Sequence, residues 1–152
     1  MYRFLFSAIV FSICLTSCGT SRKAGTHSSQ NEGITIVENL LVGKHWKLVE
    51  LMGAPVENKN GKEAFMVLSA QDNRVHGNYG CNNFTGSYKL EEGNRLSFSQ
   101  MAGTMMMCPD MEVEQAFSEV LRLADNYNIV GDQLVLNRAR MAPLARFVAV
   151  YL

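Results

Sequence analysis

The sequence predicts a mainly β fold of the α+β class: a small curved antiparallel sheet or partly closed β-barrel with one amphipathic helix. Two observations support this fold class. Short apolar-rich, β-prone runs recur along the chain between turn signals rich in Gly, Asn, Asp and Pro. Only one stretch carries apolar residues at the three- and four-residue spacing of a helix, and the sequence lacks the strand–helix alternation typical of a parallel sheet.

The N-terminus predicts export and lipid attachment. Arg3 precedes an apolar run over residues 4–15, shorter than the roughly 20 residues that cross a bilayer, so we interpret residues 1–17 as a signal peptide. The two small residues before Cys18 resemble a bacterial lipobox, in which the cysteine is acylated and becomes the mature N-terminus. Because Gly19 follows, and not aspartate, we expect lipid anchoring in the bacterial cell envelope, at the outer membrane and facing the periplasm. The alternative is an ordinary secreted protein with a chance cysteine at this position.

Residues 18–42 are interpreted as the lipidated cysteine and a flexible tether. From Gly19 to about Gly33 the chain is rich in Ser, Gly, Thr and other polar residues, which bury too little apolar surface to fold. Residues 43–152 form the predicted folded domain, long enough for one core. The full chain has 14 basic and 14 acidic side chains, a balance that argues against a nucleic-acid partner. The partners we expect are the membrane, through the lipid anchor, and an envelope protein.

Turn signals bound the strands expected in this domain. The first strand ends at Gly53-Ala54-Pro55, and Leu96 and Phe98 alternate with polar neighbours in a later one. Gly131-Asp132 is typical of a two-residue hairpin. In chain order, the expected strands are residues 45–52, 64–70, 74–79, 85–90, 95–100, 127–130, 133–136 and 144–152.

One helix is expected between the fifth and sixth of these strands. Pro109 suits a first helical turn, where its missing N–H would be unpaired in any case. Asp110, Glu112 and Glu114 lie near that positive end, where carboxylates are favoured. The apolar stripe consists of Val113, Phe117, Val120, Leu121 and Ala124. We therefore expect an amphipathic helix packed on the sheet.

Four motifs in this domain resemble a known family. They are Trp46-x-Leu48-x-x-Leu51-x-Gly53, Val75-x-Gly77-x-x-Gly80-Cys81-Asn82-x-Phe84-x-Gly86-x-Tyr88, Thr104-x-Met106-x-Cys108 and Tyr127-x-Ile129-x-Gly131-x-x-Leu134-x-Leu136. In this order they resemble the META domain of HslJ-like heat-shock and envelope proteins, over residues 43–150. Met105 departs from the pattern, which usually has a basic or hydroxyl residue there. The resemblance implies a small barrel-like fold, no established enzymatic reaction, no cofactor and an association with stress response and drug tolerance.

Cys81 and Cys108 are an even pair in a compartment expected to be oxidising. A bridge between them would close a loop of about 28 residues and stabilise the fold by roughly 3–4 kcal/mol in the chain-entropy model. It would also fix the start of the helix to the Gly-Cys-Asn turn. The alternative is two buried thiols, because cysteine is common in cores.

The leading functional hypothesis is a non-catalytic envelope lipoprotein that binds or chaperones an envelope protein or supports stress tolerance. Candidate recognition residues are Trp46, Asn82, Asn83 and Tyr88, although the glycines and asparagines of this segment are also typical of structural turns.

The alternative hypothesis is a lipoprotein that binds Cu(I), because thioethers and a thiolate are soft ligands. Its candidate ligands are Met107, Cys108 and Met111 in a methionine-rich segment, and the competing explanation is that these methionines fill the core. His45 and His76 are the available general bases, and both fit ordinary strand positions. The sequence contains no phosphate-binding glycine loop, zinc pattern or nucleophile elbow, so we predict no catalytic residues.

Overall fold

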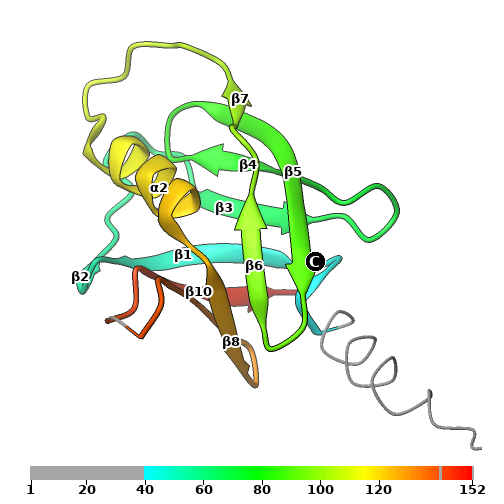
Figure 1. Ribbon diagram of the computed structural model, residues 1–152. Helices are drawn as coiled ribbons and strands as arrows, with labels where there is room; N and C mark the ends of the chain where they lie inside the picture. The colour runs from blue at the N-terminus through cyan, green and yellow to red at the C-terminus, as the bar shows by residue number, and fades with distance from the viewer. Residues whose placement is uncertain (1–39, 141, 152) are drawn as a thin grey trace, which may run out of the picture.

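Eight antiparallel strands close into a barrel, and one helix lies across one of its ends (Figure 1). The computed structural model describes residues 40–140 and 142–151. Neighbouring strands pair in the order β1, β3, β4, β5, β6, β8, β9 and β10, and β10 returns to pair with β1. Their bounds are β1 His45–Leu51, β3 Ala64–Leu68, β4 Arg74–Tyr79, β5 Asn83–Glu91, β6 Arg95–Phe98, β8 Asn126–Val130, β9 Gln133–Asn137 and β10 Ala145–Val150.

The predicted fold class is confirmed, and the sheet closes on itself because the first and last of these strands are hydrogen-bonded partners. Their register runs from His45 opposite Val150 to Leu51 opposite Ala145. Closure removes the free sheet edges that would otherwise invite pairing with other chains. Two short strands were not expected: β2 (Ala54–Pro55) pairs with β1, and β7 (Ala102–Gly103) pairs with β5.

The barrel interior is filled by inward-facing side chains of alternate strand residues and by the helix α2 (Glu112–Leu123). Phe117 of α2 is fully buried, and its ring centroid lies 5.4 Å from Tyr79, 5.7 Å from Phe84 and 5.6 Å from Phe147. Aromatic pairs at these separations add to the stability gained from burial alone. The helix therefore plugs the barrel with an aromatic side chain, and the predicted amphipathic packing is correct.

Trp46 of β1 also lies in the core and has 0% of its surface exposed. Its indole N–H donates a 2.7 Å hydrogen bond to the carbonyl of Leu41, which is itself fully buried. A buried indole requires such a partner. The prediction of Trp46 as a recognition residue is therefore wrong. Leu41 belongs to the folded body although it falls in the range assigned to the tether.

The barrel wall is weakest between β6 and β8, where the strands pair at one position only, Arg95 opposite Asn126. Beyond Arg95 the edge of β6 faces α2 instead of a strand (Figure 1). No helix within residues 40–140 and 142–151 has the length and apolar character needed to span a membrane. The predicted signal peptide, Cys18 and nearly all of the predicted tether lie outside the described residues.

Candidate functional site

The β4–β5 turn, residues 80–82, is the centre of the candidate site. Gly80 has φ +101°, a left-handed backbone conformation that favours glycine. Its N–H donates to the side-chain oxygen of Asn78 at 2.7 Å, and the Tyr79 N–H donates to the Asn82 carbonyl at 2.8 Å. The Asn78 amide also donates to the side-chain oxygen of Asn83. These local bonds fix the turn and orient the side chains that leave it.

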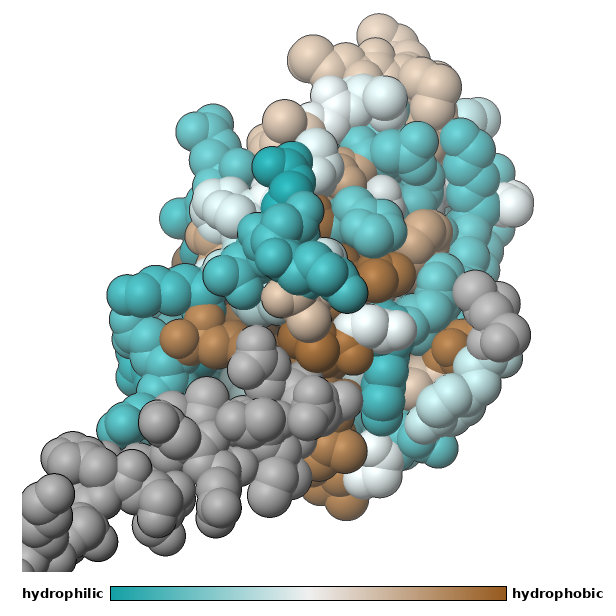
Figure 2. All heavy atoms as spheres, turned by 90° about the vertical axis from the view of Figure 1, so that its right-hand side faces the viewer, coloured by the Kyte–Doolittle hydropathy of each residue, from teal (hydrophilic) through white to brown (hydrophobic). Residues whose placement is uncertain are grey.

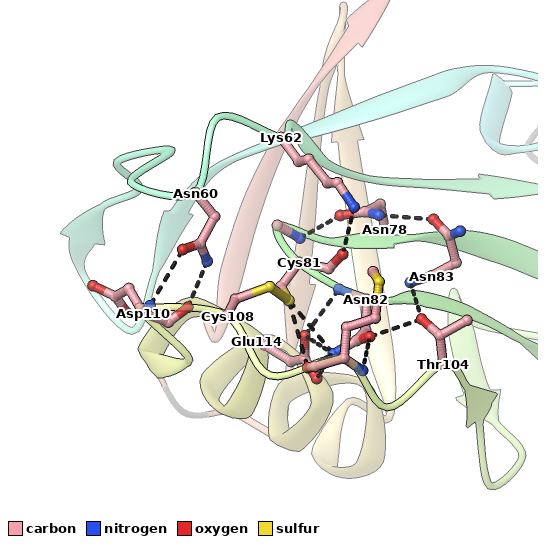
Figure 3. Close-up of a disulfide and its surroundings, with 12 residues drawn as sticks. Asn60, Lys62, Asn78, Cys81, Asn82, Asn83, Thr104, Cys108, Asp110 and Glu114 are labelled. Atoms are coloured by element: carbon pink, nitrogen blue, oxygen red, sulfur yellow. Dashed lines mark hydrogen bonds between the residues drawn. A yellow bond between two sulfur atoms is a disulfide. The ribbon is translucent and has the colours of Figure 1, made fainter.

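Asn82 connects this turn to two other elements (Figure 3). Its side-chain nitrogen donates to both Glu114 oxygens at 3.0 Å and to the Met106 carbonyl at 2.9 Å. Its side-chain oxygen accepts from the Met106 N–H at 2.7 Å and from the Thr104 hydroxyl at 2.8 Å. Its backbone N–H also donates to Glu114 at 3.0 Å. With 1% of its surface exposed, Asn82 is a buried clamp between the turn, the helix and the segment before the helix.

Cys81 and Cys108 form a disulfide with a Cα–Cα distance of 6.2 Å. It ties the same turn to the segment that joins β7 to α2, which we call the methionine loop, residues 104–111. The bond lies beside the Asn82 clamp in Figure 3, so two independent devices hold this loop. One is covalent, and the other is a hydrogen-bonded network.

The far end of the methionine loop is held at Asp110. Its carboxylate accepts from the Glu112 N–H at 2.9 Å, at the start of α2, and forms an ion pair with Lys59 at 3.1 Å. The hydrogen bond from Glu112 and then that from Lys59 lower the pKa of Asp110. Its backbone N–H donates to the Asn60 side chain at 3.2 Å. The loop is thus attached at residues 104, 106, 108 and 110.

Between these attachments the loop exposes methionine side chains. Met105 and Met107 are 97% and 99% exposed, and Met106 is 46% exposed. Figure 2 shows moderately hydrophobic side chains gathered at the top of the molecule, where Figure 1 places β7 and the start of the methionine loop. Large apolar side chains presented to solvent by a fixed loop are typical of an interaction site.

The other predicted site residues are not brought together. Tyr88 is 5% exposed, and its hydroxyl donates to the Ser69 carbonyl at 3.0 Å, so its ring is unavailable for recognition. Asn83 is exposed, next to the buried Asn82. Glu114 and Thr104 complete the clamp, and sequence reasoning assigned neither of them a role there. The sequence signal that could have pointed to them is the Gly-Cys-Asn motif, because a buried Asn82 side-chain amide requires hydrogen-bond partners from elsewhere in the chain.

Of the predicted soft-metal ligands, Met107 is fully exposed and Cys108 is in the disulfide, which removes its thiolate. Within the described part of the chain, no three His, Cys, Asp or Glu side chains are placed to hold a metal ion. The His45 Nε2–H donates to the Glu63 carboxylate at 2.8 Å, and the His45 ring stacks on Phe65. His76 lies exposed on β4. None of these contacts joins either histidine to the methionine loop.

Fold and site together define a class of protein: a small closed β-barrel, plugged by one helix, that holds an exposed loop by a disulfide and a buried asparagine. The model of one family matches residues 38–151, essentially the whole folded body. The chain belongs to the META domain family.

Solved structures share this fold. An NMR structure of a protein from Burkholderia xenovorans superimposes with a TM-score of 0.61 at 24% identity, over 89% of this chain and 99% of that one. A second NMR structure gives a TM-score of 0.57 at 23% identity, over 72% of this chain and 92% of the other. A crystal structure of a DUF4847 family protein from Bacteroides vulgatus gives 0.52 at 14% identity, over 74% and 96%. At these identities the likeness concerns the fold alone. A search of curated proteins found no significant match.

Proposed function

We propose that this META domain protein is a non-catalytic, lipid-anchored protein of the bacterial envelope that binds or chaperones another envelope protein and thereby supports stress tolerance. The binding surface in this proposal is the methionine loop. The single observation that carries it is the contrast between a tightly held loop backbone and fully exposed side chains at Met105 and Met107.

The physical argument rests on the cost of ordering a surface. A loop that is already fixed loses little conformational entropy when a partner binds, so more of the contact energy appears as affinity. Methionine side chains are flexible and polarisable, and they adapt to apolar surfaces of different shapes. A rigid backbone carrying adaptable side chains suits a protein that must hold apolar segments of a partner.

Photo-crosslinking in intact cells tests this proposal. A photoreactive amino acid replaces Met105 or Met107 in the full-length protein, and Val130, which is also exposed, is the matched control position. We expect one discrete crosslinked envelope protein from positions 105 and 107 that is absent from position 130. Identical products at all three positions, or none at 105 and 107, would contradict the proposal.

The lipid anchor at Cys18 is part of the same proposal. Growth with an alkyne-tagged fatty acid should label the wild-type protein, and Cys18→Ala should abolish both the label and recovery in the outer-membrane fraction. Because cleavage before Cys18 depends on its acylation, the variant should also retain residues 1–17, which intact-mass measurement detects. A labelled Cys18→Ala protein would contradict the anchor.

A second candidate is Cu(I) binding, favoured by the exposed thioethers of the methionine loop. Since Cys108 is bonded to Cys81, a site at Met107 and Met111 would rely on thioethers alone. Competition with a chromophoric Cu(I) chelator tests it. Stoichiometric binding that is lost in Met107→Leu/Met111→Leu would favour this function, and binding unchanged in that variant would exclude these ligands.

A further inference from the structure

An opening in the barrel wall lies beside α2, where β6 and β8 separate. These strands pair only at Arg95 and Asn126, and the next part of β6 continues through residues 99–101 into β7. The helix covers the gap without filling it. A cavity of about 650 Å³, open to solvent on one side, remains between the β6–β7 segment and α2. Its volume lies within the range of small-molecule sites, roughly 300–1,000 Å³.

The cavity lining combines apolar side chains with hydroxyl groups. Phe98, Met101 and Met105 supply the apolar part, and Thr104 and Ser118 are among the hydroxyl-bearing residues. Two of the apolar side chains are methionines, which adjust to the shape of what they contact. A ligand with a mainly apolar body would therefore find a compatible surface.

Arg122 carries the only charge among the lining residues, and it is already paired. Its Nε donates to Glu119 at 2.8 Å, and a second guanidinium nitrogen contacts the same carboxylate. Because this pair is neutral overall, the cavity offers no uncompensated charge for an ionised ligand. The lining therefore favours an uncharged molecule.

Tyr79 lines the same cavity from β4 and supplies a polar group without a partner. Its ring is stacked on Phe84 at 4.2 Å, and the residue is 6% exposed. Within the described residues, its buried hydroxyl makes no hydrogen bond of standard geometry, although the Ser118 side chain lies near enough to lower its pKa. Burial raises the pKa of Tyr79, Ser118 opposes that effect in part, and the Glu114 charge adds to it, so the phenol stays protonated and can donate.

The hydroxyl is not needed for packing. Phenylalanine would occupy the same space between Phe84 and Phe117 and would leave no buried polar group unsatisfied. A buried donor without a partner, in a residue that lines a cavity of ligand size, indicates where a ligand acceptor would lie.

We propose that the opening between β6 and α2 is a binding site for an uncharged, mainly apolar small molecule with a carbonyl or similar oxygen acceptor, and that this oxygen accepts the Tyr79 hydroxyl. The Tyr79 hydroxyl has no exposed surface, so the ligand displaces a lining side chain to reach it. The site shares Thr104 and Met105 with the methionine loop, but its ligand contact at Tyr79 does not depend on the partner binding proposed above.

The probe for the test is prodan, an uncharged naphthalene dye whose propionyl carbonyl shifts its emission to longer wavelength on accepting a hydrogen bond. The full chain is titrated with the dye and compared with Tyr79→Phe, with Ser118→Trp, which fills the cavity from the exposed side of α2, and with Tyr151→Phe. Tyr151→Phe is the matched control, because it removes a hydroxyl that contacts Asp132 outside the cavity. Circular dichroism checks that each variant is folded.

We expect saturable binding to the wild type, a ~3–10-fold weaker affinity and shorter-wavelength emission in Tyr79→Phe, and no change in Tyr151→Phe. Ser118→Trp should abolish saturable binding. With methyl-labelled methionine, the NMR signals of Met101 and Met105 should shift and that of the buried Met66 should not. Equal affinity and emission in the wild type and Tyr79→Phe, saturable binding that persists in Ser118→Trp, or its absence in the wild type would each overturn the proposal.

Discussion

Replacing Asn82 by alanine should destabilise the protein more than most single substitutions. The change removes the amide that bonds Thr104, both backbone groups of Met106 and the Glu114 carboxylate. A neutral hydrogen bond contributes about 1 kcal/mol net and one to a charged group about 1.5–3 kcal/mol. Bonds within one network are not additive, and Glu114 regains some hydration, so we expect a loss of about 3–4 kcal/mol.

The assay is urea unfolding of the oxidised protein, followed by circular dichroism, with thermal unfolding as a second measurement. A loss of this size in a domain of this length lowers Tm by roughly 10–15 °C. Asn83→Ala is the matched control, because the neighbouring exposed side chain accepts one hydrogen bond, from Asn78. We expect about 1 kcal/mol or less for the control.

Equal stabilities of Asn82→Ala and Asn83→Ala, within about 0.5 kcal/mol, would refute the argument that Asn82 is the clamp. Hydrogen exchange offers an independent check. The Met106 amide, which donates to Asn82, should lose its protection in Asn82→Ala while amides of the distant β9 keep theirs. Unchanged protection at Met106 would also contradict the argument.

Three further predictions concern the disulfide, the helix start and the barrel wall. Replacing both Cys81 and Cys108 by alanine should cost about 3–4 kcal/mol in urea unfolding, since the bridge spans 27 positions and restricts the unfolded chain; a loss below about 1 kcal/mol would contradict this. The lowered pKa of Asp110 means that its ionised form stabilises the fold above the unfolded value of about 3.9, and that this contribution disappears as the pH falls through the lower folded value. The stability difference between wild type and Asp110→Asn should therefore shrink on acidification below about pH 4, and a constant difference would contradict it. Gly77→Ala should destabilise by about 3 kcal/mol or prevent folding, because the new Cβ would lie 2.1 Å from the Phe65 carbonyl oxygen and 2.7 Å from the Phe84 ring. Thermal unfolding measures this loss. An unchanged Tm would contradict the prediction, because it would show that β3 and β5 move apart enough to admit the Cβ at no cost.

The strands and the helix were predictable because their signals are local. Residues 74–79 and 133–136 each lie entirely within one strand, where alternation and turn signals suffice. The stripe through Phe117 and Leu121 identified the buried face of the helix. Closure of the barrel was not predictable, because the pairing of His45 with Val150 depends on the geometry of every strand between them.

The site was predicted in part, and the errors have a physical cause. The sequence directed attention to the Gly-Cys-Asn turn and to the cysteine pair, and these residues do lie at the centre of the site. It did not reveal that the Asn82 amide is used internally, because Thr104 and Glu114 are far from it along the chain. A residue can belong to a family motif only because the fold needs it for packing. Trp46 and Tyr88 are such residues, since both are buried.

The pairing of β1 with β10 has a consequence for how the chain acquires its structure. The partners are 94 to 105 residues apart in sequence, so the barrel remains an open sheet with two free edges until β10 is available. Contacts of such separation slow folding, because a long loop must be ordered before any bond across it forms. The disulfide between Cys81 and Cys108 and the β4–β5 hairpin are local by comparison and can form earlier. Refolding followed in real time should therefore show the methionine loop ordered before the barrel closes.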